Sequence, residues 1–267
     1  MKLVQFVLLF VLGVIPGFAQ QPVPGDIIRR AVEVNQRDWN EAVHYDYYER
    51  EQDAGNTKTY HVVMLDGSPF SRLVAVNDQP LSGEAEAKEQ ERFANALSER
   101  EKEIPAARER RVARYRDERE RDRVLMAEIT RALDFTLAGQ ENWDGRKVYV
   151  LKGKPHPGYL PINQEAKALT GMRGTLWIDA ATFHWVKAEA EVVQPVWMAG
   201  FVARVQPGTR FVLEQMPVGD GLWMPRHYAM QAHAKVLFVF SYKSQEESTY
   251  FGYHKSGTQL ANTAALR

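Results

Sequence analysis

The sequence contains no cysteine among its 267 residues. This absence excludes disulfide bonds, cysteine-containing zinc sites, thiol nucleophiles and iron–sulfur clusters. It also removes the residue to which a bacterial lipoprotein attaches its lipid. A surplus of charge is lacking too, because 34 basic side chains balance 34 acidic ones. Since binding to phosphate backbones needs a clear basic surplus, no nucleic acid partner is expected.

Familiar motifs for catalysis and nucleotide binding are also missing. The chain has no GxGxxG after a predicted strand, no GxxxxGK[ST], no GxSxG and no HExxH. The seven histidines are scattered over predicted strands and loops, and His227 and His233, six residues apart, define no ligand geometry. We therefore predict no catalytic residue, no metal ligand, no cofactor and no enzymatic activity. A pair of acid–base carboxylates, as in a glycosidase, remains an open alternative.

Long apolar runs are few, and the clearest one extends from Leu3 to Ile15, after Lys2. It is too short to span a membrane as a helix, which needs about 20 residues. It ends at small residues before a possible cleavage point after Ala19, a pattern typical of a secretory signal peptide. We predict a signal peptide over residues 1–19, export across the inner membrane to the periplasm, and a single domain over residues 20–267. An uncleaved anchor or a buried helix is the alternative.

The remaining pattern is that of an α+β protein. Asp26 is a suitable N-cap for a first helix that ends near Trp39, and a tyrosine-rich strand follows over residues 42–52. Short turns then connect further strands, so the pairing must be antiparallel. After Leu133, strand signals recur about every ten residues to the end of the chain. This spacing predicts one highly curved antiparallel sheet of about eleven strands, covered by helices.

A highly charged segment interrupts the strand pattern over residues 82–131. Charged side chains occupy 24 of the 42 positions in residues 82–123, which favours helix, and Pro105 either divides the segment into two helices or kinks one. The net charge is −3 over residues 84–103 and +3 over residues 106–123. These helices either expose solvated faces held by i,i+4 ion pairs or contact another surface electrostatically. An acidic membrane surface and an envelope protein are both possible partners.

Alternation along the strands indicates one apolar face. In the strand that begins at His184, Val186, Ala188 and Val192 share a face, while charged residues occupy the other. Such a face must be covered by a helix or by a ligand, and the alternation of residues along a strand does not distinguish the two. Strand preference is the first explanation of the aromatic residues, and a ligand groove or sugar stacking are the alternatives. The candidate residues for a hydrophobic cavity are Leu176, Ile178, Val186, Ala188, Phe211, Leu213, Phe238 and Phe240.

Two segments resemble a known family. GTLWIDAATFHWVKAEAEV, from Gly174 to Val192, and PGTRFVLEQMPVGDGLWMPRHYAM, from Pro207 to Met230, are similar to sequences of the outer-membrane lipoprotein-sorting type in the LolA/LolB/RseB-like superfamily. The resemblance covers residues 20–80 and 133–254, and the charged block departs from it. It implies a half-open β-barrel whose helices cover a hydrophobic cavity for lipid or lipoprotein acyl chains, without catalysis. The sensor branch of the superfamily implies an alternative, in which the charged helices bind a protein partner.

Overall fold

The computed structural model describes residues 22–53, 55–164, 166–198, 203–236 and 240–257. The predicted signal peptide lies outside these residues. The helices are α1 (Pro24–Glu41), α2 (Gly83–Lys102) and α3 (Pro105–Ala132), with short 3-10 helices η1 (Ala42–His44) and η2 (Ala166–Gly171). The strands are β1 (Tyr45–Asp53), β2 (Asn56–Leu65), β3 (Ser68–Val76), β4 (Gln79–Pro80), β5 (Leu133–Trp143), β6 (Arg146–Pro155), β7 (Met172–Asp179), β8 (Trp185–Val192), β9 (Val196–Met198), β10 (Ala203–Val205), β11 (Arg210–Gly219), β12 (Leu222–Val236) and β13 (Phe240–Lys255).

The strands form one antiparallel sheet that is not closed into a barrel, which confirms the predicted α+β class. Over the described residues the sheet has thirteen strands, in the order β4-β3-β2-β1-β13-β12-β11-β8-β7-β6-β5, and the β9–β10 hairpin extends it beside β12. The expected number was about eleven. Strands β4 and β9 were not expected, because with two and three residues they are too short to produce an alternating pattern.

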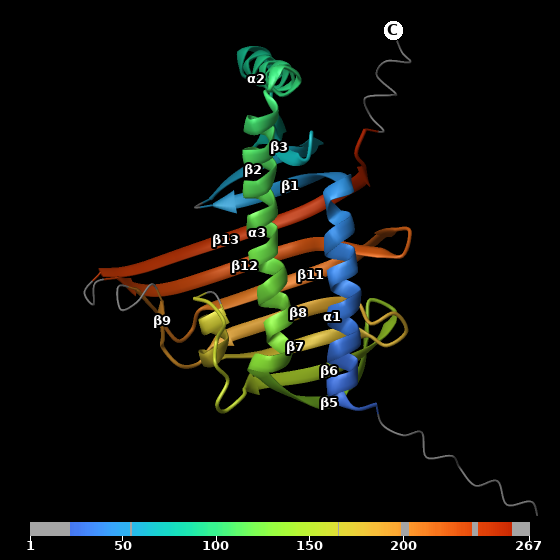
Figure 1. Cartoon of the computed structure of the whole chain (residues 1–267), viewed down its shortest axis with the longest axis vertical. Helices are drawn as coiled ribbons and strands as arrows, with labels where there is room; N and C mark the ends of the chain where they lie inside the picture. Colours follow the sequence, from blue (N-terminus) through green and yellow to red (C-terminus); the bar gives the residue numbers. More distant parts are fainter. Residues whose placement is uncertain (1–21, 54, 165, 199–202, 237–239, 258–267) are drawn as a thin grey trace, which may run out of the picture.

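Helices α1 and α3 lie side by side over the same face of the sheet (Figure 1). They run in opposite directions, since α1 leads into β1 while α3 leads into β5. Helix α2 lies beyond β3 and buries none of its residues, and its Phe93 ring contacts Phe70 of β3 at 5.6 Å between centroids. Pro105 divides the charged segment into two helices, and it begins α3 because its missing N–H has no helical partner at that position.

Helix α1 contributes one apolar side to the core. Ile27, Ile28, Ala31 and Val32 are buried against Leu151, Leu176, Ile178, Trp185 and Ala188 of the sheet. The helix starts earlier than predicted, with Val23 as its N-cap and Pro24 at its first position. Asp26 therefore lies in the first turn, where its carboxylate is favoured by the helix dipole, and does not cap the helix.

The last two strands form one long antiparallel hairpin. Strand β12 continues without a break to Val236, and β13 begins at Phe240. Gln231 and His233 pair with Gln245 and Lys243 within this hairpin. A polar pair on a solvated face does not end a strand when the ladder continues on both sides.

Candidate functional site

Three of the eight residues predicted to line a cavity are covered by α1. Leu176, Ile178 and Ala188 are at most 7% exposed and pack directly against the apolar side of that helix. Leu213 lies at the rim of the same cluster and is partly buried. Over β6, β7 and β8 the apolar face of the sheet is therefore covered by the chain's own first helix.

The other predicted residues lie elsewhere. Val186 is buried in a separate cluster with Val148 and Trp223, because a register shift between Trp177 and Ile178 changes the alternation in β8. Phe211 lines a separate surface depression with charged side chains from β7 and β8. Phe240 is the first residue of β13, and Phe238 lies outside the described residues. The predicted set thus does not form one site.

A cavity does open between the helices and the sheet, but toward β1 and β13. Its inner chamber has a volume of about 290 Å³ and lies below α1 and α3. Most of the lining is apolar or aromatic, and only Leu213 belongs to the predicted set. The lining residues are Asn35, Asp38, Trp39, Ala42, Tyr47, Met64, Pro69, Tyr115, Arg119, Met126, Leu213, Gln215, Trp223, Met224, Pro225, Tyr250 and Tyr253.

An outer chamber of about 600 Å³ adjoins the inner one. Trp39, Met64, Tyr115 and Arg119 line both chambers, so the two adjoin at these four side chains. We call the two chambers together the α1–α3 cleft. The outer chamber is further lined by Asn40, Val43, His44, Gly67, Val112, Arg116, Glu120, Arg123, Lys255 and Ser256.

Three tyrosine rings form one wall of the inner chamber. Tyr47 lies 5.3 Å from Tyr253 and 6.1 Å from Tyr250, measured between ring centroids. Burial raises the pKa of all three phenols, so they remain neutral at physiological pH. Their rings provide apolar surface, and the Tyr253 hydroxyl donates a hydrogen bond to the carbonyl oxygen of Pro225 at 2.8 Å.

Two buried amide oxygens in the inner chamber have no hydrogen-bond partner among the described residues. They are Asn35 Oδ1 and Gln215 Oε1. The Asn35 amide nitrogen donates to the carbonyl oxygen of Ala31 at 2.8 Å, which fixes the orientation of the group. Because an unpaired buried acceptor is costly, both oxygens call for a donor from water or from a ligand.

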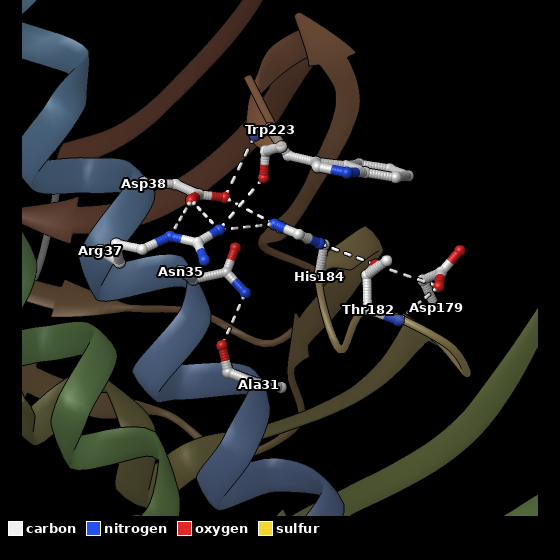
Figure 2. Close-up of polar contacts among 9 residues, drawn as sticks. Ala31, Asn35, Arg37, Asp38, Asp179, Thr182, His184 and Trp223 are labelled. Carbon is white, nitrogen blue, oxygen red and sulfur yellow. Dashed lines mark hydrogen bonds and ion pairs between the residues drawn. The ribbon is translucent and has the colours of Figure 1, made fainter. Parts of the chain in front are cut away.

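A buried polar network holds the end of α1 against the sheet (Figure 2). Asp38 Oδ2 lies 3.0 Å from His184 Nε2 and accepts the backbone N–H of Trp223 at 3.1 Å. Asp38 Oδ1 accepts the guanidinium of Arg37 at 2.8 Å, and the same guanidinium donates to the carbonyl oxygen of Gly221. Helix α1 is thereby tied to the β7–β8 turn and to the β11–β12 turn.

The second ring nitrogen of His184 and the face of its ring are also held in place. Its Nδ1 lies 2.8 Å from Thr182 Oγ1, which in turn lies 3.0 Å from Asp179 Oδ1, and its ring stacks on Trp223 at 5.2 Å. The preceding residue, Phe183, has φ of 64°, a left-handed conformation that is unfavourable for a bulky side chain. The guanidinium of Arg30 lies 3.6 Å from the centre of the Phe183 ring, so α1 also holds this strained turn.

The two helices that border the cleft are therefore held differently. Six residues of α1 are buried, and its end is fixed by the polar network. In α3 only Glu128 and Ala132 are buried, both near its C-terminal end, where Glu128 accepts the hydroxyl of Tyr159 at 2.6 Å. The part of α3 that borders the cleft is attached through Arg119, which donates to the carbonyl oxygen of Trp39 and lies 4.3 Å from that ring. Arg111 adds a hydrogen bond to Ser68 Oγ at 2.8 Å.

No group of three or more histidine, aspartate or glutamate side chains is arranged to hold a metal ion in the part of the chain that the structure describes. In the same residues, no helix has the length and apolar character needed to cross a membrane.

Comparison with known proteins gives structural neighbours only. No protein-family model and no curated protein matches the sequence. The chain is similar to a domain from Vibrio parahaemolyticus described as an outer membrane lipoprotein-sorting protein, with 11% identity, a TM-score of 0.33, and coverage of 90% of this chain and 99% of that one. It is also similar to a LolA superfamily protein from Nitrosomonas europaea, with 12% identity, a TM-score of 0.33, and coverage of 88% and 94%.

A third neighbour is a DUF1329 family protein from Desulfovibrio piger, with 13% identity, a TM-score of 0.31, and coverage of 89% of this chain and 95% of that one. The first two names match the family named from the sequence resemblance. At these identities and TM-scores the comparison gives neither the chain a family nor any of its residues a role.

Proposed function

We propose that this protein binds acyl chains in the α1–α3 cleft and catalyses no reaction. The observation that carries the proposal is the cleft itself, whose inner chamber is lined mainly by apolar and aromatic side chains below two helices. Clefts of about 300–1,000 Å³ with apolar walls and a few polar groups are typical of small-molecule sites. A lipid, or the acyl chain of a lipoprotein, fits this chemistry, and outer-membrane lipoprotein sorting is the process that it would serve.

The energetics favour a chain of moderate length. Burial gains about 0.8 kcal/mol for each CH₂ group, so ten buried groups gain about 8 kcal/mol. Loss of translational and rotational freedom costs at least about 4 kcal/mol. The remainder supports reversible binding, which suits a protein that receives and releases its cargo.

Access to the inner chamber requires one wall to move. Helix α1 is fixed by its buried side and by the Asp38–His184 network, whereas the middle of α3 is attached through few buried contacts. We therefore assign the movement to α3, with Arg119 released from Trp39 as the cleft opens.

Substitution of Met64 with tryptophan tests the proposal. Met64 lies at the junction of the two chambers, so a larger side chain there blocks passage into the inner chamber. We expect the wild type to bind a fluorescent acyl probe at one site. In the variant we expect an affinity at least about tenfold lower, equivalent to 1.4 kcal/mol, with an unchanged melting temperature.

The matched control is Leu160→Trp, which adds the same ring at a side chain that is 81% exposed and outside the cleft. It should leave probe affinity unchanged. Native mass spectrometry of protein purified from membranes provides an independent reading, with a mass increment of one acyl species. Absence of lipid in that spectrum together with no probe binding by the wild type would exclude the proposed function.

A second function is favoured by one observation, that α2 lies beyond the sheet with none of its residues buried. Such a helix is available to an envelope protein or to a membrane surface, as in an envelope sensor module. This function becomes the better explanation if the wild type binds no acyl chain.

We further propose that residues 1–19 are removed during export and that the domain of residues 20–267, with its charged insertion, works in the periplasm. Amino-terminal sequencing of the protein recovered from a periplasmic extract should then begin at Gln20. A chain that retains Met1 and stays with the membrane after carbonate washing would contradict both the cleavage and the location.

A further inference from the structure

We infer that the ligand of the α1–α3 cleft carries an anionic head group, which the outer chamber binds while the acyl chain occupies the inner chamber. This inference rests on the proposed function and names the class of its ligand: an acyl amphiphile with net negative charge at the head. Its basis is the distribution of charge around the cleft.

Positive side chains surround the outer chamber. Arg116, Arg119 and Arg123 of α3 line it together with Lys255 of β13, and Glu120 is its only lining carboxylate within the described residues. Glu120 is already paired with Arg123 at 2.5 Å. Lys255 is likewise paired with Asp220 at 2.7 Å, so an anion in this chamber meets two cations, Arg116 and Arg119, beyond these ion pairs.

Two of these cations have no carboxylate partner in the described part of the chain. The first is Arg116, which is exposed and has no ion pair there. The second is Arg119, which is occupied by the carbonyl oxygen and ring of Trp39 and lies 5.7 Å from the Tyr115 ring. An arginine placed over aromatic rings keeps N–H groups in a fixed plane, which suits bidentate contact with a phosphate or carboxylate.

The position of Arg119 connects the two chambers. Its side chain lines both, as do Trp39 and Tyr115, whereas Arg116 and Arg123 line only the outer one. A molecule with an apolar tail in the inner chamber would thus place its polar end next to Arg119 and within the outer chamber. An uncharged cargo would form no ion pair with this group of cations.

The net charge of the protein does not explain a preference for anionic ligands, because the whole chain has equal numbers of acidic and basic residues. The positive potential is local to the arginine-rich segment of α3. Contacts of this kind weaken as salt screens them, so the expected preference is largest at low ionic strength.

The experiment compares two lysolipids with the same 14-carbon chain, measured by isothermal titration calorimetry below their critical micelle concentrations. 1-Myristoyl lysophosphatidylglycerol is anionic, and 1-myristoyl lysophosphatidylcholine is zwitterionic. The wild type should bind the anionic lipid about tenfold more tightly. Substitution of Arg116 and Arg119 with glutamine should abolish this ratio, so that the two lipids bind the variant with equal affinity.

The matched control removes two charges from the same helix outside the cleft. Arg110 and Arg114 are exposed and line neither chamber. Their double substitution with glutamine should keep the tenfold ratio. Arg116→Gln alone provides a variant that cannot disturb packing and should reduce the ratio by a smaller factor.

The outcomes separate this inference from the proposed function. Equal affinity of the wild type for both lipids overturns the inference and leaves the proposed function standing. The same holds if the Arg110/Arg114 variant loses the affinity ratio as fully as the Arg116/Arg119 variant does. Failure of both lipids to bind overturns both. Glycerol 3-phosphate without an acyl chain should not displace the anionic lipid at equal concentration; displacement would identify a free phosphate site instead.

Discussion

Replacement of Asp38 with alanine is expected to lower the free energy of unfolding by about 3 kcal/mol. The side chain is only 3% exposed and accepts or pairs with three groups, from His184, Arg37 and the backbone of Trp223. Without the carboxylate, the buried ring of His184 and the N–H of Trp223 lose their partner, and such losses account for most of the cost. Urea denaturation at pH 7 measures it.

Asp26→Ala is the control on the same helix. Asp26 is 67% exposed and lies 3.6 Å from Arg29, so its removal should cost less than about 1 kcal/mol. A loss at Asp38 no larger than at Asp26 would show that the network does not hold α1.

The effect of Asp38 should also depend on pH. Burial raises the pKa of this carboxyl, but the hydrogen bonds from His184, Arg37 and Trp223 outweigh it, and the net pKa is lowered from 3.8. A group with a lowered pKa in the folded state stabilises the fold above its unfolded pKa and loses that contribution as pH falls through the folded value. The stability difference between wild type and Asp38→Ala should therefore shrink as the pH falls below about 4. A difference that grew on acidification would contradict this assignment.

The features that were predictable from sequence are local ones. The antiparallel sheet follows from short turns between alternating strands, and the division at Pro105 follows from the missing N–H of proline. The buried side of α1 was also visible, since Ile27, Ile28 and Ala31 recur at helical spacing and all are buried. Each of these depends on interactions between residues close together in the chain.

The candidate site was harder to predict because it joins distant segments. Trp39, Met64 and Tyr115 meet at the junction of the chambers, although α1, β2 and α3 are separate in the sequence. The simple alternation of faces along β8 is also interrupted at one register shift. Val186 therefore lies in a different cluster from Ala188, although the sequence pattern put both on one face. One signal was available: Asp38 lies seven residues after Ala31, on the same side of the helix, and a charged residue on a buried side indicates a polar partner.

Substitution of Ile178 with alanine is expected to reduce stability by about 3 kcal/mol while leaving acyl-chain affinity nearly unchanged. Ile178 is fully buried between the sheet and α1, so truncation leaves a cavity that neither element can fill. Leu213→Ala is the informative comparison, because this residue lines the inner chamber and should lower affinity as well. Urea denaturation and probe titration of both variants distinguish the two roles. If Ile178→Ala weakened binding and left stability intact, α1 would not be the resident cover of this face, and the ligand would occupy the position that the helix holds here.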